Sequence, residues 1–210
     1  MVIIVTGGIG SGKSEVCALI SRLYSIPLYE ADSRVKGLYG RYPDLVGNLE
    51  VLLGCGLRDD EGNFVPSMLA ARIFGDHGSL LKVEDMVFPY LKADFSEFLA
   101  ISGGHVIFES ATVLEKEAFK DFGDAVILVD APVTLRLERA CHRDGADKAK
   151  IMARMDSQRF MNMISDGTAF MAEEYATTIK RITAKILNTG TLQELEQKVR
   201  IVMDDILQNV

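Results

Sequence analysis

The sequence has few of the features that mark membrane, secreted or metal-binding proteins. Its longest apolar runs, such as residues 1–5 and 125–129, are far shorter than the ~20 residues that span a bilayer. No basic stretch precedes the first run, so a secretory signal is not expected. The three cysteines and three histidines are scattered without metal-ligand spacing. We therefore expect a soluble, cytoplasmic protein whose cysteines are thiols, with no membrane partner.

Positive charge is also scarce. The chain has 23 Lys and Arg against 30 Asp and Glu, a formal net charge of −7. This balance argues against a nucleic-acid partner, because phosphate backbones attract positive surfaces. Residues 136–159 are an exception, with seven basic and four acidic residues. On charge alone this stretch indicates a solvated helix face, but it also suits a small phosphorylated ligand.

The hydrophobic pattern alternates between short strands and amphipathic helices. Strand-like runs occupy residues 2–6, 26–29, 105–108, 125–129 and 182–187. Helical spacing covers residues 13–23, 114–122, 134–143, 146–164 and 191–207. We predict an α/β fold with a five-stranded, mainly parallel sheet flanked by helices.

Thr191 and Glu194 have the spacing of a capping box. Residues 33–100 contain helical stretches broken by glycines, without a strong strand signal, and predict a helical insert.

A glycine-rich segment directly follows the first predicted strand. Residues 7–14 read Gly-Gly-Ile-Gly-Ser-Gly-Lys-Ser and fit the phosphate-loop pattern G-x-x-x-x-G-K-[ST], with a helix after it. The glycines let backbone N–H groups turn toward a β-phosphate, and the helix adds its positive end. Lys13 would bridge the β- and γ-phosphates, and the Ser14 hydroxyl would ligate Mg²⁺. The alternative is a glycine-rich turn with an incidental lysine. We predict that ATP is bound by Gly8, Gly10, Ser11, Gly12, Lys13, Ser14 and Glu15.

A phosphate loop predicts a nucleotide but no particular reaction. A kinase also needs a carboxylate near the acceptor hydroxyl, and Asp32 follows the second predicted strand at the sheet edge where ligands bind. The alternative role for Asp32 is to cap the next helix. A switch protein would instead need an Asp-x-x-Gly segment, whereas Asp130 is followed by Ala-Pro.

Arginines on two predicted helices suit a water-excluding lid over the phosphates. Arg139 and Arg143 are four residues apart and share a helix face. Arg154 follows on the next charged segment, with Gln158 one turn beyond it. Guanidinium groups hold phosphate oxygens and stabilise a transferring phosphoryl group. The alternative is surface ion pairing, for example of Arg139 with Glu138 or Asp144.

Taken in order, these segments resemble the dephospho-CoA kinase family. The matching segments are residues 7–14, Glu30-Ala31-Asp32, residues 129–132, Leu137-x-Arg139-x-x-x-Arg143-Asp144, Arg154-x-x-x-Gln158 and Ile186-x-Asn188-x-Gly190. The resemblance implies ATP-dependent phosphorylation of the ribose 3′-hydroxyl of dephospho-CoA, with Mg²⁺ as cofactor. It also implies a single P-loop NTPase-type domain whose parts are a core of about 1–32, 103–138 and 180–210, an acceptor-binding region of about 33–102 and a lid of about 139–165.

The resemblance also implies roles for individual residues. Asp32 would be the general base, Lys13 would act on the phosphates, and Arg139 would contact ATP from the lid. Arg143 would belong to the same lid pattern. Asn188 and Gly190 match a segment near the adenine.

Several positions depart from the family pattern. Glu30-Ala31-Asp32 stands where the family has Asp-x-Asp, Phe88-Pro89 where it has His-Pro, and Ala111-Thr112 where it has Pro-Leu. These departures lie on the acceptor side. The alternative acceptor is therefore a nucleoside monophosphate or another small hydroxyl compound. A non-catalytic nucleotide switch is the remaining alternative, supported only by the generality of the loop.

Overall fold

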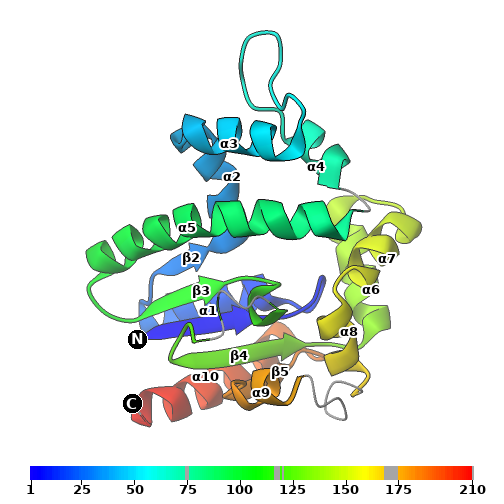
Figure 1. Ribbon diagram of the computed structural model, residues 1–210. Coiled ribbons are helices and arrows are strands. Elements are labelled where there is room, and N and C mark those ends of the chain that lie inside the picture. The colour runs from blue at the N-terminus through cyan, green and yellow to red at the C-terminus, as the bar shows by residue number, and fades with distance from the viewer. Residues whose placement is uncertain (74–75, 116–118, 120, 168–174, 210) are drawn as a thin grey trace. The chain divides into compact units, whose positions relative to one another are not determined.

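The chain folds into two compact units. The computed structural model describes residues 1–73, 76–115, 119, 121–167 and 175–209, apart from the side chains of residues 77 and 159. Unit 1 comprises residues 1–29 and 104–210, and unit 2 comprises residues 30–103. Figure 1 shows the helices and strands that build each unit.

The core of the fold is a five-stranded sheet. Its strands are β1 (Val2–Thr6), β2 (Leu28–Glu30), β3 (Val106–Glu109), β4 (Ala125–Asp130) and β5 (Ala184–Leu187), in the order β2-β3-β1-β4-β5 (Figure 1). The pairings of β1 with β3, of β1 with β4 and of β4 with β5 are all parallel. Every residue of β3 and β4 is buried, as expected for parallel strands covered on both faces. The predicted α/β fold is confirmed.

Successive residues of β3 bury side chains on opposite faces of the sheet. Ile107 joins a cluster with buried side chains of α1 (Lys13–Tyr24) and α10 (Leu192–Gln208). Phe108 instead stacks on Tyr29 at 5.4 Å between ring centroids and meets Phe122 edge-on at 4.8 Å. Burying one such apolar side chain stabilises the fold by roughly 1.5–3 kcal/mol, so both faces contribute to holding the strands.

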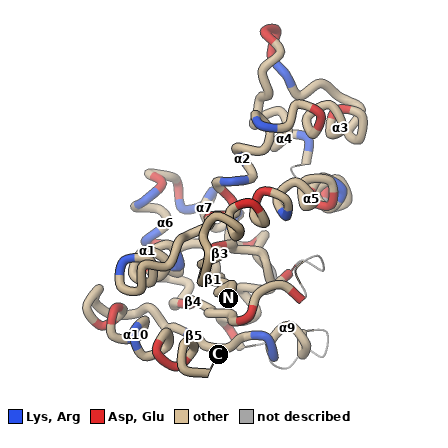
Figure 2. The backbone as a smooth tube through the Cα atoms, turned by 90° about the vertical axis from the view of Figure 1, so that its left-hand side faces the viewer, with Lys and Arg blue, Asp and Glu red and all other residues tan. Residues whose placement is uncertain are grey.

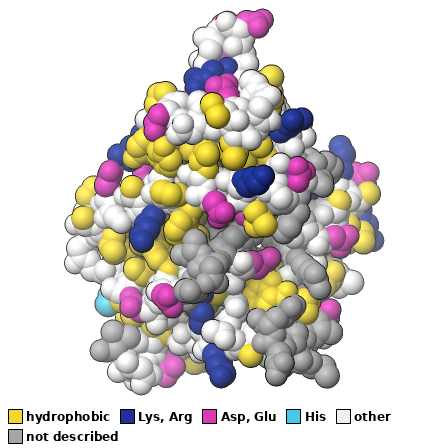
Figure 3. Space-filling model, in the orientation of Figure 1, with side chains coloured by type: hydrophobic (Ala, Val, Ile, Leu, Met, Phe, Trp, Pro, Cys, Tyr) yellow, Lys and Arg dark blue, Asp and Glu magenta, His cyan; other side chains and the backbone are white. Residues whose placement is uncertain are grey.

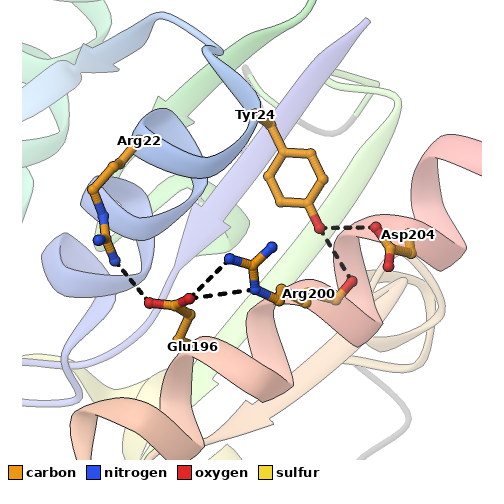
Figure 4. A network of polar contacts seen from close by, with 5 residues as sticks. All are labelled: Arg22, Tyr24, Glu196, Arg200 and Asp204. Atoms are coloured by element: carbon orange, nitrogen blue, oxygen red, sulfur yellow. Dashed lines mark hydrogen bonds and ion pairs between the residues drawn. The ribbon is translucent and has the colours of Figure 1, made fainter.

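Polar contacts also join α1 to α10 (Figure 4). The Arg22 guanidinium donates to Glu196 at 2.8 Å, and the Tyr24 hydroxyl donates to Asp204 at 2.8 Å. The predicted capping box of α10 is present, because Thr191 Oγ1 accepts from the Glu194 N–H at 3.3 Å and the Glu194 carboxylate accepts from the Thr191 N–H at 2.7 Å.

The remaining helices of unit 1 differ from two of the helices predicted from the sequence. They are η1 (Val113–Glu115), α6 (Val133–Asp144), α7 (Lys148–Asp156), α8 (Arg159–Ser165) and α9 (Ala176–Lys180). The helix expected over 114–122 is wrong, because residues 113–115 form one 3-10 turn, residue 121 lies in a turn and residue 122 has no regular secondary structure; residues 116–118 and 120 lie outside the described residues. The single helix expected over 146–164 is two helices, because Gln158 leaves the helical conformation at φ −90° and ψ 62°.

Unit 2 is helical, as predicted. It contains α2 (Ala31–Arg41), α3 (Pro43–Leu53), α4 (Pro66–Ile73) and α5 (His77–Ser102), and α5 packs against the other three. Asp94 on α5 is buried and accepts from Arg41 at 2.8 Å. Pro89 lies inside α5. Hydrophobic side chains gather on this unit at the level of α3 and α5 (Figure 3). None of the described helices is long and apolar enough to cross a membrane.

Candidate nucleotide-binding site

The glycine-rich loop joins β1 to α1. Gly10 and Gly12 have left-handed φ angles of 75° and 93°, which glycine adopts without steric cost. The Ser11 N–H donates to the Gly8 carbonyl at 3.1 Å and closes the turn. Gly12 occupies the N-cap of α1 and has no side chain to bond the first N–H groups of the helix. The loop therefore presents a helix N-terminus whose N–H groups and dipole attract an anion.

Lys13 and a carboxylate that sequence reasoning missed lie together beside this loop. The Lys13 ammonium is 3.3 Å from Glu109 Oε1, and their side chains are only 14% and 10% exposed. Glu109 ends β3, the neighbour of β1. Its signal in the sequence is an acidic residue at the carboxyl end of a strand, the same signal that singled out Asp32, but the predicted strand stopped at Phe108.

Arg139 and Asn188 are brought to the loop as well. Asn188 follows β5, is 7% exposed, and donates from Nδ2 to the Ser11 carbonyl at 3.0 Å. Arg139 on α6 donates to the Asn188 carbonyl at 3.1 Å. A Cβ added to Gly12 would come within 2.1 Å of Asn188 Nδ2. The close packing of Asn188 thus explains why glycine is needed at this position.

Two other arginines of α6 and α7 form ion pairs with one carboxylate. Arg143 donates to Asp144 at 2.7 Å, and Arg154 donates to the same carboxylate at 2.8 Å. The two bonds lower the pKa of Asp144 to about 2. Figure 2 shows basic and acidic residues interspersed along α6 and α7. Arg143 and Arg154 thus form ion pairs of the kind that the alternative expected, while Arg139 contacts the Asn188 backbone.

The other predicted residues are not in this cluster of contacts. Glu15 is exposed in the first turn of α1, where the helix dipole stabilises a negative charge. Ser14 is exposed next to Lys13. Gly190 directly precedes the N-cap Thr191.

Asp32 is exposed in the first turn of α2, within unit 2. The N-cap of α2 is Glu30, so the capping alternative for Asp32 is wrong.

Two further buried side chains contact the loop and were not predicted to do so. Arg136 Nε donates to the Ile9 carbonyl at 3.0 Å, and Gln158 Oε1 accepts from the Ile9 N–H at 2.8 Å. Sequence reasoning counted Arg136 only as charge and placed Gln158 only in a motif. Their link to Ile9 spans more than a hundred residues, so spacing carries no signal of it.

The arrangement suits a nucleotide phosphate group. The helix N-terminus and Lys13 supply positive potential, and Ser14 and Glu109 are oxygen ligands of the kind that Mg²⁺ prefers. No group of three or more His, Cys, Asp or Glu side chains that could hold a metal ion occurs among the described residues.

Comparisons with known proteins show the family to which the chain belongs. A sequence model of the dephospho-CoA kinase family matches residues 1–163. A dephospho-CoA kinase of Porphyromonas gingivalis is 36% identical over 73% of this chain and 75% of that protein. One from Clostridium perfringens is 28% identical over 97% of this chain and 94% of that protein. The crystal structure of TT1252 from Thermus thermophilus aligns with a TM-score of 0.76 at 27% identity, covering 98% of this chain and 97% of that one. The chain, whose glycine-rich loop and whose Arg139 and Arg143 fall within the matched residues, belongs to the dephospho-CoA kinase family.

Proposed function

We propose that this protein transfers the γ-phosphoryl group of ATP to the ribose 3′-hydroxyl of dephospho-CoA. The observation that carries the proposal is the family match over residues 1–163, which contains the loop, Asp32 and the lid arginines. The contacts among Ser11, Asn188 and Arg139 support it, because they link Arg139 through Asn188 to the glycine-rich loop. We also place the enzyme in the cytoplasm, where its scattered cysteines would stay reduced.

Different residues of the chain would bind the phosphates, Mg²⁺ and the adenine. The N–H groups of the loop and the start of α1 hold the β-phosphate, and Lys13 contacts the β- and γ-phosphates. Ser14 and Glu109 would hold Mg²⁺, which neutralises charge on the phosphates when it is bound. Glu109 now pairs with Lys13 at 3.3 Å, so nucleotide phosphates would compete with Glu109 for the ammonium group. Asn188 and Gly190 would lie near the adenine.

The transfer step needs a base and charge stabilisation. Asp32 would accept the proton of the attacking hydroxyl as the acceptor oxygen bonds to the γ-phosphorus and the bond to the β-phosphate oxygen breaks. Arg139 would stabilise the negative charge spread over the transferring group. Arg143 is held by Asp144, so it reaches ATP only if that ion pair opens.

A product-resolved assay tests the proposal. Purified protein is incubated with ATP and either dephospho-CoA or each nucleoside monophosphate, with Mg²⁺ and with EDTA. We expect CoA as the dominant product, and only when Mg²⁺ is present. Lys13→Ala, which removes the phosphate contact, is the control for contaminating kinases. A nucleoside diphosphate as the main product would move the enzyme to another acceptor, and phosphorylation of neither acceptor with normal ATP binding would refute the proposal.

A further inference from the structure

Ile9, in the middle of the phosphate loop, has both of its backbone polar groups bonded to side chains from distant elements. Its carbonyl accepts from Arg136 Nε at 3.0 Å, and its N–H donates to Gln158 Oε1 at 2.8 Å. Neither group can therefore turn toward a ligand without losing a bond. The adjacent residues Gly8 and Gly10 impose little restriction of their own, because glycine is conformationally permissive.

Arg136 is buried against the loop. The residue is 0% exposed, and a Cβ added to Gly8 would come within 2.0 Å of its Nη2 atom. Its Nη1 donates to Ser165 Oγ at 2.9 Å, and that hydroxyl donates to Asp130 at 2.7 Å. Burial lowers the pKa of Arg136 although the nearby Asp130 carboxylate opposes this shift, and an arginine in a protein stays charged. The guanidinium is thus bonded to Ser165 on α8, which is in turn bonded to Asp130 at the end of β4.

Gln158 is buried too, and its side chain does not cap the helix that it begins. It occupies the N-cap of α8 but makes no side-chain capping bond. N-cap residues usually use a side-chain oxygen to accept from the first N–H groups of their helix. Gln158 is 8% exposed, and its amide oxygen accepts from Ile9 instead. The break between α7 and α8 therefore coincides with a contact to the phosphate loop.

We propose that Arg136 and Gln158 are positioning residues that hold the phosphate loop in its nucleotide-binding conformation through Ile9. The inference rests on the proposed function only in that the loop binds ATP. A preorganised loop loses less conformational entropy when it binds a ligand, so affinity rises without a new contact to that ligand. Loss of either hydrogen bond to Ile9 therefore weakens ATP binding, although Arg136 and Gln158 bond Ile9 and not the N–H groups of Lys13 and Ser14.

Direct binding of Mg-ATP to single variants tests this. Gln158→Met keeps the side-chain volume and removes the acceptor, and Arg136→Gln removes the guanidinium. We expect each to raise the Kd for Mg-ATP by about tenfold, equivalent to about 1.4 kcal/mol. In the double variant the rise should be smaller than the product of the two single rises, because both side chains hold one residue. Titration calorimetry needs no acceptor, so failure of the proposed kinase reaction would not be confused with failure of this inference.

Arg181→Gln is the matched control. Arg181 is another partly buried arginine of unit 1 that donates to a backbone carbonyl, that of Phe122, at 2.8 Å. It should lower the melting temperature as the other variants do, while leaving the Kd for Mg-ATP within about twofold of the parent. Gln158→Met still tests the idea if Arg136→Gln leaves little folded protein. An unchanged Kd in Gln158→Met, or an equal rise of Kd in Arg181→Gln, would overturn the proposal.

Discussion

Single side chains near the loop have different partners although their sequence context is alike. Arg139 and Arg143 lie one turn apart on α6, yet one donates to a backbone carbonyl beside the loop and the other to Asp144. Exposed ion pairs of this kind stabilise a fold by only about 0–1 kcal/mol. Arg143 can therefore exchange Asp144 for a phosphate at small cost, whereas Arg139 already lies at the loop.

The proposed role of Asp32 as general base can be tested with a single substitution. Asp32→Asn removes the proton acceptor and keeps the size of the side chain. We expect kcat to fall by roughly 10²–10⁴-fold, the usual cost of losing a general base, with the Kd for ATP little changed. Steady-state kinetics and direct ATP titration measure the two quantities. An ordinary kcat would show that Asp32 has no part in proton transfer.

At the scale of elements, α1 and α10 are joined by a polar network as well as by the core (Figure 4). Glu196 bonds Arg22 and Arg200, and Tyr24 donates to Asp204 and to the Arg200 carbonyl. Burial, and then the hydrogen bond to Asp204, raise the pKa of Tyr24 to about 12. Because α1 begins at the phosphate loop, contacts that hold this helix also support the site.

The raised pKa of Tyr24 predicts a pH dependence. The folded state keeps the phenol neutral to a higher pH than the unfolded state, whose tyrosine titrates near 10. The stabilisation by Tyr24 is thus full below pH 10 and is lost as the pH rises through about 12. Tyr24→Phe should cost about 0.5–1 kcal/mol of unfolding free energy at pH 8, and the difference from the parent should shrink from pH 10 upward. A difference that stays constant over this range would contradict the assignment.

At the scale of the whole molecule, every loop contact described above lies within unit 1. Binding of ATP there should stabilise the folded protein by mass action. At a ligand concentration about 100 times its Kd, we expect the unfolding free energy to rise by about 2.7 kcal/mol. Denaturant unfolding with and without Mg-ATP measures the increase. Lys13→Ala should largely abolish it at the same ATP concentration, and an equal increase in that variant would place ATP elsewhere.

Local features of the molecule were determined by the sequence alone. The phosphate loop, the capping box of Thr191 and Glu194, and the alternation that predicts a parallel sheet each depend on neighbouring residues, so their spacing shows them. The order of several motifs also identified the family. The roles of Asp32, Asn188 and Gly190 in the reaction stay predictions.

Only the tertiary structure decided which side chains meet. Lys13 with Glu109, and Ile9 with Arg136 and Gln158, are pairs separated by about a hundred residues or more, and no periodicity relates them. The helix predicted over 146–164 failed for the same reason. The predicted helix continued through Gln158, but the hydrogen bond between this residue and Ile9 coincides with the point where the helix breaks. Local spacing predicts which elements form, whereas contacts between elements distant in the chain depend on how those elements pack.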